Sequence, residues 1–246
     1  QQGSIDMYVG STGPLGGFAP SVQILDIPFL FRDYVHVDKV LDGPIGQALL
    51  ADLDKVQMKG LAFWENGFRN LTNSRKVIKT PEDAKGLKIR TMENPVHIQA
   101  WKTAGVNPTP MAWGEVYGAL QQGVIDGQEN PVAVILQVKV YEVQKQLALT
   151  QHVYSPAVLI MSARRWNQLP KEDQEIILQA AREGAAYQRK LGRDNEEQML
   201  AELQKNGVTV TRDVNKEAWV AAMKPAFESF SAQFGKDKID AILNTK

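Results

Sequence analysis

The sequence predicts an α/β protein of two lobes that are spanned by one long helix. Short apolar runs typical of strands alternate with helical stretches along the chain, which is the pattern of α/β proteins. Residues 171–206 also form a stretch of 36 residues without proline. An unbroken helix of that length would measure roughly 54 Å, more than the width of one small domain. At 246 residues, the chain is long enough for one large domain or two small ones.

Five segments have the pattern of strands. Residues 4–9 alternate between polar and apolar side chains and stop at Gly10, as expected for a half-buried strand. The other segments are short apolar runs, and Pro28 interrupts the first of them. These runs are residues 24–31, 57–64, 87–90 and 158–161.

Two helices have clear boundaries. Thr80 is a predicted N-cap, Pro81 follows at the first helical position, and Gly86 ends that short helix. A second helix is predicted over residues 114–122 and ends at Gly123. The strand at 87–90 comes directly after the first helix, as expected in an α/β fold.

The next two helices are less sharply bounded. Asn130 before Pro131 predicts an N-cap, from which a helix runs toward Gln146. In the proline-free stretch, apolar residues recur with helical period, and we expect one helix that bends near Gly184 or Gly192 or crosses between lobes. The alternative is two helices with a break at Gly192.

Composition excludes several function classes. Lys and Arg total 28, as do Asp and Glu, so no basic excess points to nucleic acid or to anionic lipid. No apolar run approaches the roughly 18 residues of a membrane span. The absence of cysteine excludes disulfides, thiolate nucleophiles, Cys-type zinc sites and iron–sulfur ligation.

Common catalytic and metal-binding motifs are also absent. The sequence has neither a phosphate-binding loop, a dinucleotide-binding glycine pattern nor a nucleophile elbow. His36, His97 and His152 are far apart in sequence, so we expect no metal site and a satisfied hydrogen bond for each ring. Asp126 and Glu129 could form a general acid–base pair. The plainer interpretation places Asp126 in a turn and Glu129 in the first turn of the next helix.

Several side chains could bind an anion. Arg90 ends a predicted strand, where ligands of open α/β sheets bind, and its planar fork matches a carboxylate. Arg69 shares this possibility, although either arginine could simply be exposed. Asn130 at a helix N-terminus could help to hold an anion or could only cap its own helix. Trp113 could form the floor of a pocket or belong to the core.

Seven segments of the chain together resemble one family. The sequence is similar to the solute-binding proteins of tripartite ATP-independent periplasmic (TRAP) transporters, of the dicarboxylate-binding type. The resemblance covers nearly the whole chain and rests on residues 3–7, 26–31, 66–69, 80–90, 108–121, 126–131 and 141–145.

The resemblance implies two α/β lobes that close over a ligand. We expect one lobe from residues 1–66 and 156–195 and the other from 67–155 and 196–246. Family members usually begin with a further strand–helix–strand–helix unit, so we expect the first lobe to lack its N-terminal part. The resemblance also implies a periplasmic protein whose signal peptide has been removed.

The resemblance assigns roles residue by residue. It makes Arg90 the carboxylate clamp, Asn130 its supporting donor, Arg69 a second arginine near the ligand and Trp113 an aromatic contact. Polar side chains from the other lobe and the return crossing are expected to reach the cleft. They are Ser11, Thr12, Tyr154 and Ser155.

The expected function is a receptor that delivers a small organic acid to a TRAP membrane permease and performs no chemistry. The polar candidates favour a hydroxylated acid, such as an aldonate or a uronate. A C4-dicarboxylate held by Arg69 is the alternative, and an aromatic or branched monocarboxylate stacked on Trp113 is another. An enzyme that uses Asp126 and Glu129 is the alternative from a different class. We expect a monomer with no cofactor and no metal.

Overall fold

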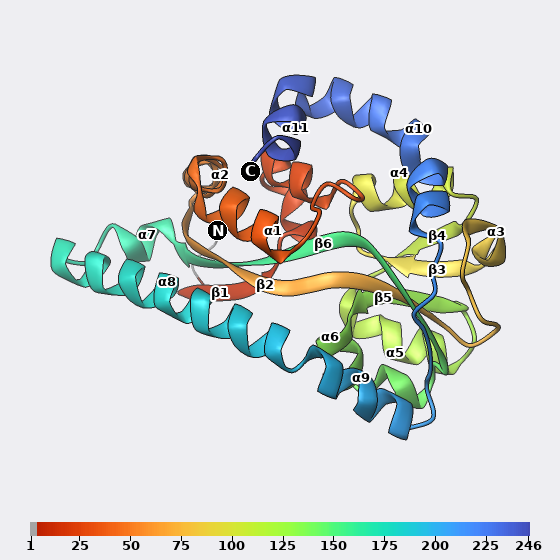
Figure 1. Cartoon of the computed structure of the whole chain (residues 1–246). Coiled ribbons are helices and arrows are strands. Elements are labelled where there is room, and N and C mark those ends of the chain that lie inside the picture. Colours follow the sequence, from red (N-terminus) through yellow and green to blue (C-terminus); the bar gives the residue numbers. More distant parts are fainter. Residues whose placement is uncertain (1–3) are drawn as a thin grey trace.

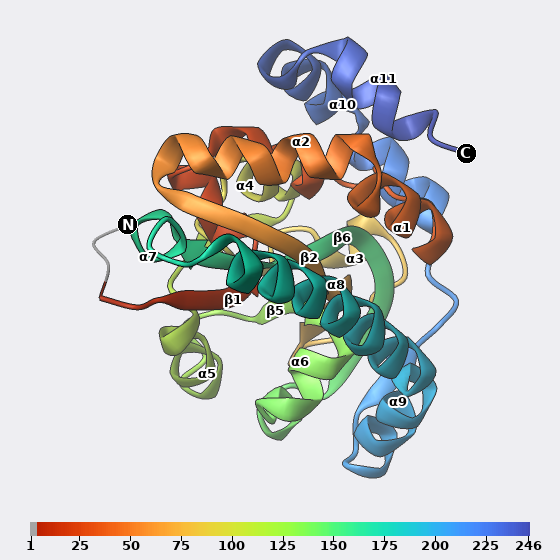
Figure 2. The ribbon, with the colours of Figure 1, turned by 90° about the vertical axis from the view of Figure 1, so that its left-hand side faces the viewer.

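One mixed β-sheet runs through the molecule, and helices pack on both of its faces (Figures 1 and 2). The computed structural model describes residues 4–246, so Gly3 of the first family segment lies outside the described residues. The strands follow the order β1 (Met7–Ser11), β6 (Gln146–Ser162), β2 (Met58–Asn73), β5 (Gly127–Pro131), β3 (Lys88–Thr91) and β4 (Asn107–Pro110). A short strand, β7 (Thr209–Thr211), pairs with β6.

The two long strands β2 and β6 connect the two ends of the sheet. They contain 16 and 17 residues and pair antiparallel over most of their length. The predicted strands at 57–64 and 158–161 are therefore confirmed, but each is only one end of a longer strand. Register shifts interrupt the pairing, and one of them lies between Glu65 and Gly67. Gly67 has a φ of 113°, which other residues rarely adopt.

The parallel part of the sheet confirms the predicted pattern of helices and strands. Thr80 and Asp83 form a capping box at α3 (Pro81–Ala84), and β3 follows. Helix α4 (Pro95–Thr103) leads to β4, and α5 (Trp113–Gln121) leads to β5. Because β3 pairs parallel with both β4 and β5, the carboxyl ends of these strands lie at one edge.

The predicted strand at 24–31 is wrong. After η1 (Gly13–Gly17), the chain forms a second 3-10 helix, η2 (Pro20–Asp26), and then an irregular segment. Pro28 cannot donate a ladder hydrogen bond, and Phe29 adopts a positive φ of 56°. The apolar residues of this run are buried all the same, which is why their sequence resembles that of a core strand.

The predicted helix that begins at Asn130 is also wrong. Asn130 and Pro131 are the last two residues of β5, and the helix α6 (Val132–Gln137) starts after them. A second short turn, η4 (Val140–Glu142), precedes β6, which begins at Gln146. Pro131 is compatible with both structures because its fixed φ suits a helix start and the end of a strand.

The long proline-free stretch forms two helices. After α7 (Ala163–Trp166), helix α8 (Lys171–Asp194) is continuous over 24 residues, and α9 (Glu196–Lys205) follows. The alternative of two helices is confirmed, but the break lies at Asn195 and not at Gly192. A Cβ atom at Gly184 would lie 2.9 Å from the Trp64 ring, so this glycine admits the indole.

The remaining helices lie on the same side of the sheet as α4 and opposite α5, α6 and α9 (Figure 2). They are α1 (Tyr34–Asp42), α2 (Pro44–Asp52) with the turn η3 (Leu53–Val56), α10 (Lys216–Phe234) and α11 (Lys236–Leu243). The largest apolar core joins these helices to α4 and to both long strands, whereas a second core lies between α5, α6 and α9. The lobe boundaries expected from the sequence remain a proposal. Helix α10, which that expectation places in the second lobe, packs against η2, which it places in the first.

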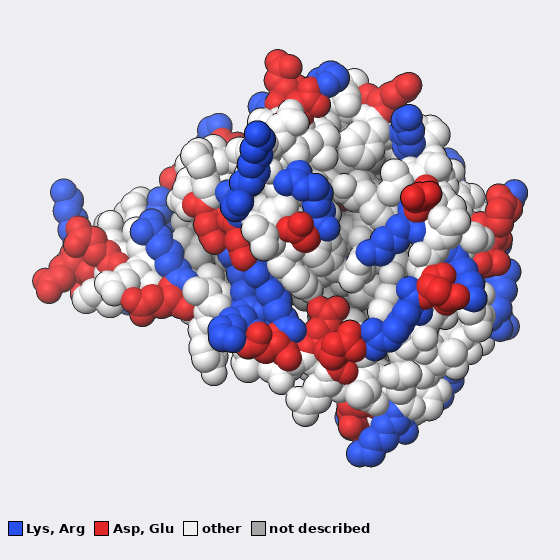
Figure 3. Space-filling model, in the orientation of Figure 1, with Lys and Arg blue, Asp and Glu red and all other residues white. Residues whose placement is uncertain are grey.

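The surface agrees with the charge balance of the sequence. Basic and acidic side chains lie interspersed on the face shown in Figure 3. Within residues 4–246, no helix combines the length and hydropathy needed to cross a bilayer.

Candidate functional site

Arg90 lies near the carboxyl end of β3 and is almost completely buried, with 4% of its surface exposed. Its Nε and Nη2 atoms donate to the main-chain oxygen of Met111 at 3.1 and 2.8 Å. The guanidinium carbon also lies 5.3 Å from the centre of the Trp113 ring. These contacts hold the guanidinium plane in place, and among residues 4–246 no acceptor faces Nη1.

The Arg90 charge is buried without a paired carboxylate. Within residues 4–246, the salt bridges formed by arginines all involve arginines other than Arg90. Burial lowers the pKa of Arg90 to about 10, an effect that the more distant Glu129 opposes, so the group stays charged at neutral pH. A buried cation in this state favours an incoming anion.

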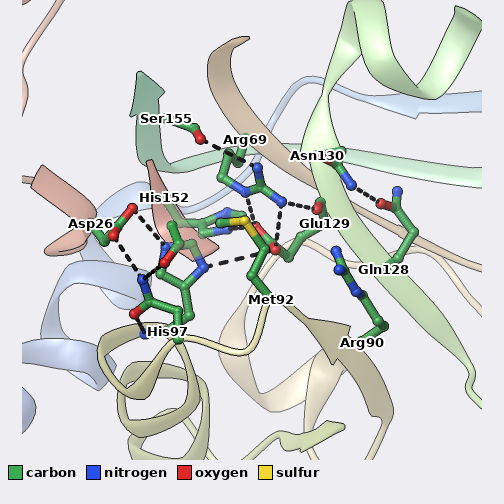
Figure 4. A network of polar contacts seen from close by, with 12 residues as sticks. Asp26, Arg69, Arg90, Met92, His97, Gln128, Glu129, Asn130, His152 and Ser155 are labelled. Carbon is green, nitrogen blue, oxygen red and sulfur yellow. Dashed lines mark hydrogen bonds and ion pairs between the residues drawn. The ribbon is translucent and has the colours of Figure 1, made fainter. Parts of the chain in front are cut away.

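Arg69, on β2, has its charge balanced by Glu129, on β5 (Figure 4). Its Nη2 atom donates to Glu129 Oε1 at 2.8 Å and to the Glu129 main-chain oxygen at 2.6 Å. His152 Nε2 lies 3.0 Å from Glu129 Oε2, and its Nδ1 lies 2.7 Å from Thr150 Oγ1. All four side chains are buried.

The protonation states in this group follow from the contacts. Burial raises the pKa of Glu129, but the Arg69 guanidinium and His152 outweigh this effect and hold the pKa well below its usual range. Burial lowers the pKa of His152 more than Glu129 raises it. His152 is therefore neutral at pH 7, with Nε2–H donating to Glu129 and Nδ1 accepting from Thr150.

A second buried polar group adjoins the first (Figure 4). Asn94 caps α4 by accepting from the Val96 main-chain N–H at 2.9 Å, and it donates to Asp26 Oδ2 at 2.7 Å. His97, one turn into α4, has Nε2 at 3.5 Å from Asp26 Oδ1 and Nδ1 at 4.0 Å from Glu129 Oε1. The ring thus lies between the two carboxylates.

The expectation of a satisfied hydrogen bond holds for two of the three histidines. His36 Nε2 lies 2.8 Å from the Ile242 main-chain oxygen, and His152 has the two contacts described above. Both ring nitrogens of His97 are buried without a hydrogen-bond partner, so the prediction for His97 is wrong.

Asn130 lies at the end of β5, and 6% of its surface is exposed. It does not cap a helix, as the sequence predicted, because Pro131 is the N-cap residue of α6. Its Nδ2 atom instead donates to Gln128 Oε1 at 2.6 Å. Asn130 and Arg90 nevertheless come from the same edge of the parallel strands, and Figure 4 shows them on the same side of the group.

Ser11 and Ser155 meet beside Arg69. Their hydroxyl oxygens lie 3.2 Å apart, and Arg69 Nη1 donates to Ser155 Oγ at 3.5 Å. Ser11 is only partly buried, at the end of β1. Thr12 is fully buried, and its hydroxyl donates to the Pro156 main-chain oxygen at 3.4 Å. Thr12 therefore holds β1 against β6.

Tyr154 has contacts that differ from those of Ser155, its neighbour in β6. Successive side chains of a strand point to opposite faces, and Tyr154 lies among aromatic rings that include Phe68. Its hydroxyl donates to Glu65 Oε2 at 2.9 Å, and Arg193 binds the same carboxylate. Burial raises the pKa of Tyr154 well above its usual value, and the negative charge of Glu65 adds to this effect.

Asp126 and Glu129 do not form a catalytic pair. Asp126 Oδ2 accepts from the Lys88 main-chain N–H at 2.9 Å, and Arg75 binds its other oxygen at 2.7 Å. Glu129 belongs to β5 and not to a helical turn, so the plainer interpretation of its position is wrong. Within the described part of the chain, no group of three His, Cys, Asp or Glu residues could hold a metal ion.

Sequence reasoning missed most of the buried network behind the arginines. His152 and His97 were set aside because nothing in the sequence links them to a carboxylate. Asn94 before Pro95 carried the same N-cap signal as Asn130, and here the signal is correct. No pattern in the sequence relates Asp26 to Asn94, 68 residues away.

The arrangement can bind a carboxylate. Arg90 supplies an unpaired charge, Asn130 supplies an amide, and Ser11 and Ser155 supply hydroxyls. Glu129, a fully buried carboxylate beside them, is bound by Arg69. The pKa of Glu129 is lowered, whereas a general acid at neutral pH needs a raised pKa.

Comparisons with known proteins agree with this geometry. Residues 1–233 match DctP, the bacterial extracellular solute-binding protein family 7. The chain is 42% identical to the 2,3-diketo-L-gulonate-binding periplasmic protein YiaO of Escherichia coli, over 90% of this chain and 67% of that protein.

Two crystal structures have the same fold. One is a TRAP periplasmic solute-binding protein from Polaromonas sp. JS666 bound to D-erythronate, with a TM-score of 0.98 and 50% identity. This chain covers 80% of it and is itself covered to 99%. The other is the sugar acid binding protein DctPAm from Advenella mimigardefordensis with galactonate, with a TM-score of 0.95, 38% identity, and 99% and 79% of the two chains covered. The family match over most of the chain and the shared two-lobed fold show that this chain belongs to the solute-binding proteins of TRAP transporters, family 7.

Proposed function

We propose that the chain is a periplasmic receptor for a small hydroxylated monocarboxylic acid of the sugar-acid type. The observation that carries this proposal is the buried Arg90 guanidinium, which has no carboxylate partner among residues 4–246. An organic acid would supply the missing negative charge through its carboxylate. The sugar acids bound by the two crystallised relatives support the same ligand class.

The pairing of Arg69 argues against the C4-dicarboxylate alternative. A second ligand carboxylate would need a second available cation, and Glu129 already balances the charge of Arg69. Only the Nη1 side of Arg69 is directed elsewhere, toward the hydroxyl of Ser155. A ligand hydroxyl near Ser11 and Ser155 suits this environment better than a carboxylate, because it needs no counter-charge.

The binding role predicts no turnover. An enzyme that used Asp126 and Glu129 would need two carboxylates that face one substrate, whereas each is engaged with its own arginine. We propose that the chain works as a monomer, binds its ligand stoichiometrically and passes it to a TRAP membrane permease. Closure of the lobes would follow if the ligand contacts both lobes only in the closed state.

A thermal-shift screen against organic acids tests the proposal. The set would contain D-erythronate, galactonate, a uronate, succinate and an uncharged sugar. A one-site ligand present at about 100 times its Kd adds about 2.7 kcal/mol of stability. We expect stabilisation by at least one hydroxylated monocarboxylate and none by the uncharged sugar. Stabilisation by succinate alone would favour the dicarboxylate alternative, and no stabilisation by any acid would contradict the receptor proposal.

A further inference from the structure

A chain of buried hydrogen bonds leads from Asn130 into the sheet. Asn130 Nδ2 donates to Gln128 Oε1 at 2.6 Å, and Gln128 Nε2 donates to Thr72 Oγ1 at 2.9 Å. The Thr72 hydroxyl donates to Gln144 Oε1 at 3.1 Å. Gln128, Thr72 and Gln144 have at most 1% of their surface exposed, so water does not compete for these bonds.

The direction of this chain is set by main-chain carbonyl groups. Gln144 Nε2 lies 3.1 Å from the Val143 oxygen and 3.4 Å from the Asp126 oxygen. A carbonyl oxygen only accepts, so the nitrogen of Gln144 must face these two atoms and its oxygen must face Thr72. The single proton of the Thr72 hydroxyl has two acceptors, Gln144 Oε1 at 3.1 Å and the Gln128 main-chain oxygen at 3.3 Å. With the proton on either of them, the hydroxyl oxygen accepts from Gln128 Nε2.

The last member of the chain is Asn130, whose orientation is fixed as a result. Gln128 must present its oxygen to Asn130, and Asn130 must present its nitrogen to Gln128. An amide has two N–H groups and one oxygen. Asn130 therefore keeps one N–H and its Oδ1 atom for a ligand.

Gln128 also lies next to the carboxylate clamp. It is the register partner of Arg90 in the parallel pair of β3 and β5, and residues paired in this way share a face of the sheet. A carboxylate on the Nη1 side of Arg90 can accept the free N–H of Asn130. A hydroxyl on the adjacent carbon can donate to Asn130 Oδ1.

We propose that Gln128 is a positioning residue that, through Thr72 and Gln144, orients Asn130 for acids that carry a hydroxyl group next to the carboxylate. This inference rests on the proposed function and narrows its ligand class to 2-hydroxy acids. Neither Thr72 nor Gln144 contacts the ligand in this arrangement. Their effect on binding passes through the amide orientation of Gln128 and Asn130.

The test compares two acids that differ in one hydroxyl group. D-Erythronate carries the 2-hydroxyl, and 3,4-dihydroxybutanoate lacks it. Calorimetry on the wild-type protein should give about tenfold tighter binding of D-erythronate, the value of one net hydrogen bond. If the screen identifies a different hydroxy acid, that acid and its 2-deoxy analogue take their place.

Variants at Thr72 separate positioning from folding. Thr72→Ser keeps the hydroxyl and should keep the preference, whereas Thr72→Val keeps the shape and should reduce the ratio of the two affinities toward one. Gln128→Met is a second variant for the case that Thr72→Val does not fold. It should also reduce the ratio of the two affinities toward one. A general loss of stability would weaken the binding of both acids alike and leave the ratio of their affinities unchanged.

The outcomes separate this inference from the function itself. A wild-type protein that binds both acids equally well overturns the inference and leaves the receptor proposal intact. The same holds if Thr72→Val or Gln128→Met folds and retains the wild-type ratio. A wild-type protein that binds no acid in the screen overturns the receptor proposal.

Discussion

Arg90 and Arg69 are both almost completely buried, at 4% and 1% exposure, but their charges are balanced differently. Arg69 is bound by Glu129, which His152 also contacts. Arg90 is held by the uncharged Met111 carbonyl and the Trp113 ring. The comparison teaches that burial alone does not identify a ligand-binding arginine. The deciding feature is whether the fold supplies the counter-charge.

The largest effect is expected on stability, when Arg69 loses its partner Glu129. Glu129→Gln leaves the Arg69 charge buried without its partner, so the free energy of unfolding should fall by about 3–5 kcal/mol. Urea denaturation measures this change. Glu82→Gln is the matched control, because the exposed pair of Glu82 with Lys85 contributes no more than about 1 kcal/mol.

The double variant Arg69→Met with Glu129→Leu sharpens this test. It removes both charges at once and should recover most of the stability lost in Glu129→Gln. A Glu129→Gln protein as stable as the wild type would show that Arg69 does not depend on Glu129, and the contrast with Arg90 would lose its basis.

A substitution of Arg90, the arginine without a paired carboxylate, should change the affinity for the ligand. Arg90→Ala removes the only uncompensated charge of the site and should weaken binding of the acid found in the screen by about 2–5 kcal/mol. Isothermal titration calorimetry measures the loss. Arg212→Ala, an exposed arginine paired with Glu197, is the control and should bind like the wild type. Near-wild-type affinity of Arg90→Ala would reject the clamp.

The pH dependence of stability tests the paired network again. The pKa of His152 is lower in the folded protein than in the unfolded chain, so the unfolded chain binds the proton more strongly. Stability should therefore fall as the pH falls through about 6.5, by at most about 1.4 kcal/mol per pH unit for this one proton. The lowered pKa of Glu129 adds a further loss below about pH 4.5.

His152→Gln isolates the first of these losses. The amide can keep a hydrogen bond to Glu129 but does not titrate, so the decline in stability between pH 7.5 and 5 should be smaller than in the wild type. Thermal denaturation in a series of buffers measures the slope. An identical slope in the two proteins would assign the loss to another group.

The smallest effect is expected at Trp113. This ring is 41% exposed and lies against the Arg90 guanidinium. Trp113→Ala should weaken ligand binding by about 0.5–1 kcal/mol, the range of an exposed cation–π contact. Trp113→Phe keeps an aromatic face and should recover part of the affinity. Equal affinities for wild type and Trp113→Ala would show that the Met111 carbonyl is enough to hold Arg90.

Local chemistry made part of the fold predictable. The Thr80 N-cap, the strand after its helix and the helix ended by Gly123 were predicted correctly because each signal lies within a few residues. Errors arose where one signal suits two structures. Asn130 before Pro131 suits an N-cap as well as the end of a strand, and the apolar run at 24–31 suits a core strand as well as a buried 3-10 helix.

The candidate site was predictable to a similar degree. The position of Arg90 after a short strand and the family resemblance indicated a carboxylate clamp. The Glu129 partner of Arg69 was not predictable, because it is 60 residues away along the chain. His152, which contacts Glu129, is 83 residues away from Arg69. Tyr154 and Ser155 were assigned one role, whereas neighbouring side chains of β6 point to opposite faces.

The sequence by itself determined the α/β class, the family and which arginine, Arg90, is the proposed carboxylate clamp. These features depend on local propensity, on spacing and on residues that lie close together in the chain. Only the tertiary structure decided which arginine is neutralised, how Asn130 is oriented and where the long helix breaks. The first two depend on contacts between distant segments, such as Glu129 against Arg69 and Thr72 against Gln144.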